Sequence, residues 1–98
     1  MKLTMTKNGS ALAVNIAERL DTTTAPQFEK EISAEIAGVT DLTLDFAELS
    51  YVSSAGLRAL LGLQKTMNKQ GSMVIRNVNE NIMEVFEITG FVDILTIE

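Results

Sequence analysis

The sequence predicts one α/β domain built on a mixed β-sheet, with an N-terminal antiparallel hairpin, otherwise parallel strands, and helices covering one face. Three observations predict this fold class. The 98 residues suit one hydrophobic core, so we expect a single domain over residues 1–98. Hydrophobic residues make up 46% of the chain, an ordinary share for a globular protein. Segments with strand periodicity and segments with helical periodicity follow one another in the order β-β-α-β-α-β-α.

The pair Asn8-Gly9 predicts the turn of the hairpin, because both central positions of such a turn take positive φ. Counting outward from this turn pairs Met5 with Leu12. Apolar residues then share one face of the hairpin, and small or polar residues share the other. This pattern is typical of a sheet that is buried on one side.

The first helix is predicted to begin near Ala25, because apolar residues recur there at helical spacing while glutamates face outward. Thr24 and Gln27 have the spacing of a capping box, and Pro26 suits the first turn. Gly38 is the expected end of this helix.

The remaining elements follow the same two periodicities. A strand is predicted over residues 41–46, and a short apolar strand, which we expect to be central, over residues 73–76. The second helix is predicted over residues 53–70, ended by Gly71, and the third begins after Asn77 or Asn79 and ends at Gly90. The segment 91–97 fits a last strand or a short helix. The buried stripe of the second helix is expected to contain Leu57, Leu60, Leu61, Gln64 and Met67.

The predicted topology also indicates where a site should lie. Binding sites of such sheets lie beyond the carboxyl ends of the strands. Three predicted loops fulfil this condition, over residues 21–24, 49–54 and 77–79. We therefore look for functional residues in these loops.

The composition excludes several classes of function. The chain has no cysteine, which excludes disulfides and thiolate metal sites, and no histidine, which excludes a Ser-His-Asp triad. The net charge of −5 argues against nucleic-acid binding. No apolar run reaches the roughly 20 residues that cross a bilayer, and the first residues lack a signal peptide, so we expect a cytosolic protein without membrane insertion. The polar outer sheet face and the negative charge favour a monomer, and we expect no cofactor and no metal.

Two serines, Ser53 and Ser54, stand where a strand passes into the second helix. Either hydroxyl suits a helix cap, which is the simpler interpretation. Gly56 weakens the first turn of the helix, so it indicates the close approach of backbone, a ligand or a partner. A helix N-terminus also tolerates a phosphate, which would add a charge of about −1.5 to −2 to this surface. Arg58, four residues after Ser54, either reaches back toward such a phosphate or is a solvated arginine.

Three segments together resemble the STAS domain family, and within it the small stand-alone anti-sigma factor antagonists. Residues 51–61, YVSSAGLRALL, resemble the signature of the family at its strand-helix junction. Residues 19–26, RLDTTTAP, resemble its loop before the first helix, and residues 42–46, LTLDF, resemble its central strand. The resemblance covers nearly the whole chain and implies a STAS-like fold.

The resemblance implies a regulatory protein and not an enzyme. Antagonists of this family bind a serine-kinase anti-sigma factor when unphosphorylated, leave it when phosphorylated, and are reset by a serine phosphatase. When the Gly-Leu pair at residues 56–57 is aligned, the phosphorylated serine of the family falls on Ser54. Ser53 stands where the family often has Asp, and it is the alternative acceptor. The partner-binding residues that we expect from this resemblance are Asp21, Thr22, Thr23, Asp45, Ser53, Gly56 and Arg58.

Some of these residues have a purely structural interpretation as well. The carboxylate of Asp21 can bind its own backbone in a turn, and Asp45 can face water near the end of a strand. Thr22 and Thr23 are better explained as turn residues than as phosphate acceptors. The functional and structural interpretations of the two aspartates stay open at this point.

Three other functions compete with the regulatory one. Catalysis through Ser54 needs a base, and Lys65 lies about 16 Å along the helix. Asp21 and Asp45 are a weak signal for Mg²⁺. Nucleotide binding needs a phosphate cradle, and the sequence has neither a Walker A nor a G-x-G-x-x-G motif. The strongest alternative is a STAS docking subunit of a lipid-transport or stress-sensing complex without a phospho-switch.

Overall fold

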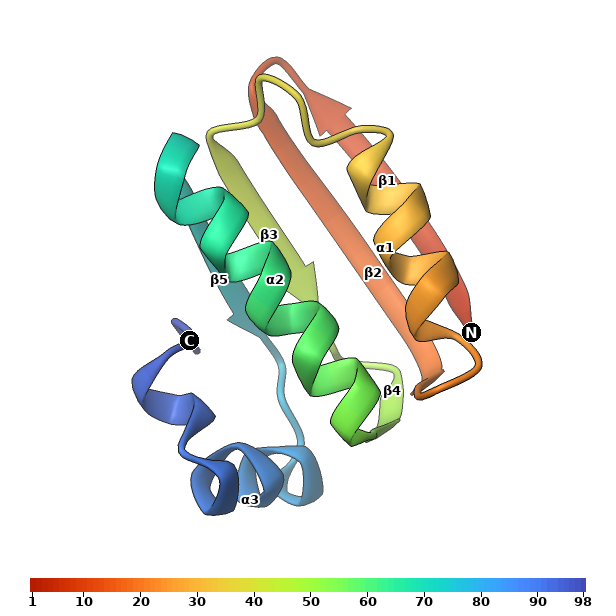
Figure 1. Ribbon diagram of the computed structural model, residues 1–98. Helices are drawn as coiled ribbons and strands as arrows, with labels where there is room; N and C mark the ends of the chain where they lie inside the picture. The colour runs from red at the N-terminus through yellow and green to blue at the C-terminus, as the bar shows by residue number, and fades with distance from the viewer.

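Helices lie over one face of a five-stranded sheet in the computed structural model, which describes residues 1–98 (Figure 1). The strands are β1 (Lys2–Asn8), β2 (Ala11–Leu20), β3 (Asp41–Asp45), β4 (Leu49–Val52) and β5 (Ser72–Arg76). The helices are α1 (Ala25–Ser33), α2 (Ser54–Gln70) and α3 (Glu80–Thr89), followed by the 3-10 turn η1 (Phe91–Asp93). The predicted fold class is confirmed, with α1 and α2 on the covered face and α3 beside β4.

Strand β2 organises the sheet, because it pairs with three other strands. The order is β1-β2-β3-β5, and β4 also pairs with β2. Strand β1 is antiparallel to β2, whereas β3, β4 and β5 are joined by parallel pairing. The first part of β2, residues 11–15, pairs with β3, and its last part, residues 18–20, pairs with β4. The carboxyl ends of β2 and β4 therefore lie side by side.

The hairpin turn lies at Gly9-Ser10, so the prediction of a turn at Asn8-Gly9 was wrong by one residue. Met5 consequently pairs with Val14 and not with Leu12. Glycine at the first central position, here with φ of 63°, is the arrangement of a type II′ turn. Because side chains alternate with a period of two, this two-residue shift in register keeps the same residues on the buried face.

Strand β4 lies within residues 49–54, so the prediction of a loop over all of these residues was wrong. It is only four residues long, with Leu49 and Val52 buried and the two residues between them exposed, so it lacks the alternation typical of a strand. A shift in register between Glu18 and Arg19 accompanies the change of partner from β3 to β4, and Glu18 has a φ of 75°. The strand forms because β2 continues beyond the end of β3 and offers it free backbone groups.

Strand β5 stands last in the strand order, so the prediction that it is central was wrong. It is nevertheless apolar, because Met73 and Ile75 are buried in the core. Its outer edge is partly covered by the C-terminal segment, where Ile97 forms a parallel bridge with Ile75. The backbone N–H of Ile75 donates to Thr96, and Glu98 donates back to Ile75, both over 2.9 Å. The segment 91–97 thus begins as a 3-10 turn and ends in a strand-like bridge.

Helix α1 ends at Ser33, well before the predicted end at Gly38. The backbone of Glu35 donates to the carbonyl of Ile32 over 2.9 Å, a turn tighter than the helix. Gly38, with φ of 78°, instead lies in the turn that brings the buried Val39 into the core. Helical spacing persists after the helix has ended, which explains why the sequence predicted a longer element.

The ends of α2 and α3 agree with the predictions. Ser53 caps α2 and Gly71 ends it, while Asn79 caps α3 and Gly90 ends it with φ of 79°. The predicted stripe of α2 is buried except for Leu61, which is half-buried. None of the three helices is long and apolar enough to cross a membrane.

The core contains 22 buried hydrophobic residues, which come from the sheet, from all three helices and from the C-terminal segment at Leu95. One polar side chain, Gln64 of α2, is buried among them with 5% of its surface exposed. Its Nε2 donates to Oδ1 of Asn68 over 2.8 Å, but its Oε1 has no hydrogen-bond partner. The core is thus apolar apart from one unsatisfied carbonyl.

Candidate functional site

The loop after β2 and the junction after β4 meet at one end of the sheet (Figure 1). The backbone N–H of Ser53 donates to the carbonyl of Leu20 over 2.9 Å, which joins the last residue of β2 to the residue that follows β4. Residues 21–24 and the start of α2 consequently leave the sheet side by side. Two of the three predicted loops are thus brought together by parallel pairing of their strands.

The carboxylate of Asp21 organises the loop after β2. Its Oδ1 accepts hydrogen bonds from the backbone N–H groups of Thr23 and Thr24, over 3.0 and 3.1 Å, and from the Thr23 hydroxyl over 2.7 Å. The structural interpretation of Asp21 as a turn residue is therefore correct. The Thr23 hydroxyl makes the largest contribution to holding the pKa of Asp21 well below its ordinary value of 3.8, against the opposing effect of partial burial.

Thr24 does not form the predicted capping box with Gln27. It precedes the first residue of α1, but its side chain makes no capping hydrogen bond to that helix. Its hydroxyl oxygen instead accepts from the backbone N–H of Asp21 over 2.8 Å and lies 2.9 Å from the carbonyl of Arg19, to which it can donate. The hydroxyl stabilises the loop, and Pro26 near the helix start reduces the number of N–H groups that need a cap.

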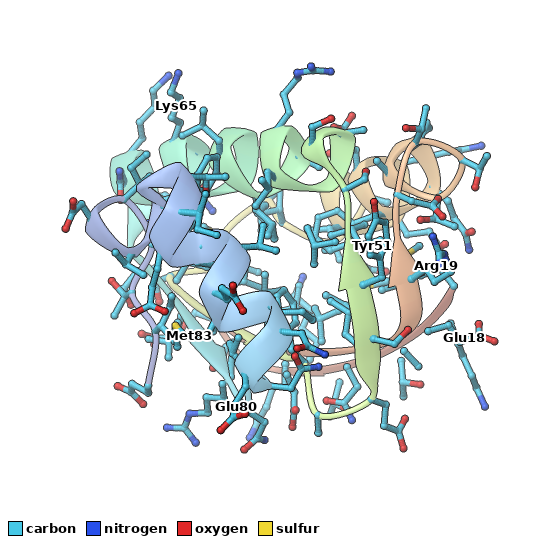
Figure 2. The ribbon with its side chains drawn as sticks, turned by 90° about the horizontal axis from the view of Figure 1, so that it is seen from below. Glu18, Arg19, Tyr51, Lys65, Glu80 and Met83 are labelled. Atoms are coloured by element: carbon cyan, nitrogen blue, oxygen red, sulfur yellow. The ribbon has the colours of Figure 1, made fainter.

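Arg19 and Tyr51 lie beside this loop, and neither was among the predicted site residues. They are register partners in the β2–β4 pair, and the guanidinium carbon of Arg19 lies 4.4 Å from the centre of the Tyr51 ring (Figure 2). Arg19 Nε also donates to Asp21 Oδ2 over 3.2 Å. Tyr51 remains 44% exposed although the cation of Arg19 lies over its ring. Recognition of β4 as a strand would have placed these two side chains together.

The two serines at the start of α2 have different surroundings. Ser53 is half-buried, and its Oγ accepts from the backbone N–H of Gly56 over 3.3 Å, so it is the helix cap. Ser54 is the first residue of α2, is exposed, and its hydroxyl makes no hydrogen bond with another residue of the chain. The structural role of a cap therefore belongs to Ser53, and the hydroxyl of Ser54 is free.

Gly56 is buried, and a close approach of backbone explains it. A Cβ atom at this position would lie 2.6 Å from the carbonyl oxygen of Leu20 and 3.0 Å from side-chain atoms of Leu20 and Val52. Glycine thus allows the first turn of α2 to rest on the ends of β2 and β4. The sequence left open whether backbone, a ligand or a partner approaches Gly56, and the structure shows the close approach of backbone.

The exposed surface around Ser54 contains the other predicted residues of this region. Thr22 and Thr23 lie on the exposed side of the loop after β2. Arg58 is exposed one turn further along α2 than Ser54 and forms no ion pair. These residues and Tyr51 are thus all exposed near the end of the sheet where β2 and β4 finish.

Asp45 is the last residue of β3 and belongs to a separate hydrogen-bond network beside the predicted loop at residues 77–79. Its Oδ1 accepts from the backbone N–H of Ala47 over 2.9 Å and from Nδ2 of Asn77 over 3.0 Å. Asn79 caps α3 through Ile82 and donates to the carbonyl of Leu49 over 3.0 Å. No hydrogen bond joins Asp45 to residues 21–24 or to Ser54, so the structure does not bring this residue into the same cluster.

The chain is similar to known proteins over nearly its whole length. The STAS domain family matches residues 2–98. BtrV of Bordetella bronchiseptica is 36% identical over 99 residues, an alignment that covers 99% of this chain and 85% of BtrV. The anti-sigma-B factor antagonist of Bacillus subtilis is 33% identical over 92 residues, covering 93% of this chain and 84% of that protein.

Solved structures show the same fold at lower identity. The anti-sigma factor antagonist SpoIIAA in its unphosphorylated form superposes with a TM-score of 0.77 at 19% identity, covering 99% of this chain and 87% of SpoIIAA. The Bacillus cell fate determinant SpoIIAA in its phosphorylated form superposes with the same TM-score at 20% identity, covering 99% of this chain and 91% of SpoIIAA. Because the family matches nearly the whole chain and two of these relatives are more than 30% identical to it, the chain belongs to the STAS domain family.

Proposed function

We propose that this chain is an anti-sigma factor antagonist that binds a serine-kinase anti-sigma factor when unphosphorylated and leaves it when Ser54 is phosphorylated. The observation that carries the proposal is the contrast between the two serines. Ser53 is engaged as the cap of α2, whereas the hydroxyl of Ser54 is exposed and unbonded. A kinase can therefore modify Ser54 without removing an interaction that the fold uses.

The start of α2 also suits the product of that reaction. A phosphate on Ser54 would stand at the N-terminus of a helix of 17 residues, where free N–H groups and the helix dipole favour negative charge. Arg58, one turn further on, adds a cation on the same side of the helix. Phosphorylation thus changes the charge of the surface by about −1.5 to −2 while the fold stays intact.

The partner-binding surface of the proposal is the region around this serine. It consists of Thr22 and Thr23 from the loop after β2, Tyr51 from β4, and Ser54 with Arg58 from α2. Asp21 contributes by holding its loop in shape, and Gly56 contributes by seating the helix. Relatives that carry the name anti-sigma factor antagonist support an anti-sigma factor as the partner, and a serine phosphatase would reset the switch.

The first experiment measures phosphorylation directly. The purified chain is incubated with ATP and each kinase-like anti-sigma factor encoded by its host, and the modified residue is located by mass spectrometry. We expect one phosphate on Ser54, none in Ser54→Ala, and unchanged modification of Ser54 in Ser53→Ala after correction for any loss of folded protein. Phosphate on Ser53 alone would contradict the assignment.

The second experiment measures binding by titration calorimetry. We expect the unmodified chain and Ser54→Ala to bind the anti-sigma factor, and Ser54→Asp to bind much more weakly. Ser10→Asp is the matched control, because Ser10 is an exposed serine in the hairpin turn at the opposite end of β2. If Ser54→Asp and Ser10→Asp bind with equal affinity, the docking subunit without a phospho-switch becomes the better explanation.

A further inference from the structure

Helix α2 carries a charge opposite to that of the chain. The chain has a net charge of −5 and only eight Lys and Arg residues. Three of these eight, Arg58, Lys65 and Lys69, lie on α2, which contains no Asp or Glu. In contrast, α3 contains three glutamates and no Lys or Arg. The basic residues are therefore concentrated on the helix that begins with Ser54.

The three cations of α2 lie on one face of the helix. With Gly62 they occupy positions i, i+4, i+7 and i+11, which fall along one side of an α-helix. We call Arg58, Gly62, Lys65 and Lys69 the cationic face. All four residues are exposed, and none takes part in an ion pair within the chain. Figure 2 shows Lys65 directed away from the molecule, on a different side from Glu80 of α3.

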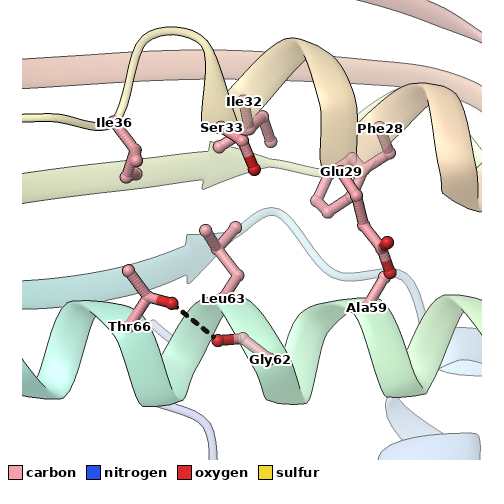
Figure 3. Close-up of a pocket in the computed structure, with 9 residues that line it drawn as sticks. All are labelled: Phe28, Glu29, Ile32, Ser33, Ile36, Ala59, Gly62, Leu63 and Thr66. Carbon is pink, nitrogen blue, oxygen red and sulfur yellow. Dashed lines mark hydrogen bonds between the residues drawn. The ribbon is translucent and has the colours of Figure 1, made fainter.

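An open groove between α1 and α2 runs beside this face (Figure 3). Its volume is about 290 Å³, and its apolar lining comes from Phe28, Ile32 and Ile36 on one side and Ala59 and Leu63 on the other. Glu29 is the one carboxylate in the lining. Gly62 lines the groove and lies between Arg58 and Lys65 on the cationic face. A Cβ atom at this position would meet no heavy atom within 4 Å. An exposed glycine in mid-helix weakens α2 and leaves a low point over which another backbone can pass closely.

We propose that the cationic face is the docking site for an acidic helix of the anti-sigma factor, an inference that rests on the function proposed above. A helix with carboxylates at the same spacing would meet Arg58, Lys65 and Lys69 while its backbone passes over Gly62. Apolar residues on the side of that helix would enter the groove. The negative charge of the rest of this chain would repel the same helix elsewhere, so the charge distribution directs it to α2.

This docking site also gives a phosphate at Ser54 a direct way to weaken binding. Ser54 precedes Arg58 by four residues, so a phosphate there stands at the end of the cationic face. Its charge of about −1.5 to −2 would engage Arg58 directly and would repel a carboxylate that approaches this end of the face. The acidic helix would then lose its contact with Arg58 and part of its attraction to the cationic face.

The test uses the complex of the full chain with its anti-sigma factor and a carbodiimide, which joins a lysine amine directly to a carboxylate. We expect cross-links from Lys65 and Lys69 to Asp or Glu residues of a helix in the partner. Cross-links that involve only Lys2, Lys7 or Lys30 would overturn the proposal.

Charge reversal tests the same site by affinity. We expect Lys65→Glu/Lys69→Glu to weaken binding roughly tenfold at low salt and less at high salt. The matched control is Lys2→Glu/Lys7→Glu, which changes the net charge by the same amount on β1, at the far edge of the sheet. Gly62→Leu, which keeps every charge, should also weaken binding because its side chain fills the low point.

The outcomes separate this inference from the function on which it rests. If the unmodified chain binds no anti-sigma factor, both are overturned. If it binds and responds to Ser54→Asp, but the two double reversals weaken binding equally, the function stands and the cationic face is overturned as the docking site.

Discussion

The carbonyl oxygen of Leu20 lies 2.6 Å from the place that a Cβ atom on Gly56 would occupy. Helix α2 therefore rests directly on the end of β2, and even a methyl group must push the two apart. We expect Gly56→Ala to lower the free energy of unfolding by about 1–3 kcal/mol, as overpacked core positions do. Urea denaturation followed by circular dichroism measures this change, and unchanged stability would show that the helix can shift freely.

Gly62 gives the opposite prediction on the same helix. Its missing side chain faces open space, and alanine has a higher helix propensity than glycine. We expect Gly62→Ala to raise the free energy of unfolding by about 1 kcal/mol. Each of the variants Gly56→Ala and Gly62→Ala is the control for the other, because both add one methyl group to α2. A loss of stability in Gly62→Ala would mean that the groove is closed in solution.

Substitution of the two serines at the start of α2 should change the stability of the protein by different amounts. Ser53→Ala removes the cap that Gly56 N–H uses, so we expect a loss of about 1 kcal/mol. Ser54→Ala removes a hydroxyl without a hydrogen bond, so its effect should stay within about 0.5 kcal/mol. Thermal denaturation of both variants checks this difference, and equal losses would assign a structural role to Ser54 as well.

The carboxylate of Asp21 makes the free energy of unfolding depend on pH under acidic conditions. Its pKa is held below 3.8 in the folded protein, mainly by the Thr23 hydroxyl and also by Arg19, so the folded state favours the ionised form. The stabilisation is fully present above the unfolded pKa and is lost as the pH falls from about 4 toward the folded pKa. We therefore expect the stability difference between the chain and Asp21→Asn to shrink between pH 5 and pH 2.

Urea denaturation at several pH values measures that difference. Asp93→Asn serves as the comparison, because Asp93 is an exposed aspartate that accepts no side-chain hydrogen bond. A difference that is the same at pH 7 and at pH 2 would contradict the role of the Asp21 carboxylate.

The unsatisfied carbonyl of Gln64 gives a stabilising substitution. A buried acceptor without a partner costs about 1–3 kcal/mol, and methionine has a similar shape without that acceptor. We expect Gln64→Met to raise the free energy of unfolding by about 1 kcal/mol, since the exposed Asn68 can turn to water. A destabilised variant would indicate that Oε1 binds an ordered water molecule.

The comparison of β1 with β4 shows what the sequence can and cannot predict. The faces of the hairpin follow from side-chain alternation, and they were correct even though the turn was one residue away from Asn8-Gly9. Strand β4 has no alternation, because it exists only where the long β2 extends past β3. Such a strand depends on tertiary pairing, which a local pattern does not reveal.

The candidate site also has features that the sequence could predict and features that it could not. The strand-helix junction at Ser53 and Ser54 and the turn at Asp21 are local features, so their positions could be predicted from neighbouring residues. The stacking of Arg19 on Tyr51 joins two strands whose pairing was not predicted, and it could not be found. The separation of Asp45 from the other residues likewise depends on the point at which β2 changes its pairing partner.

The bridge between Ile97 and Ile75 has a consequence for how this protein behaves at high concentration. An exposed edge strand with unpaired backbone groups invites another chain to extend the sheet, which is a route to aggregation. The C-terminal segment occupies part of that edge on β5, and Lys2 and Lys7 place charges along β1 at the opposite side. Both features make it harder for the edge of another sheet to pair with this one.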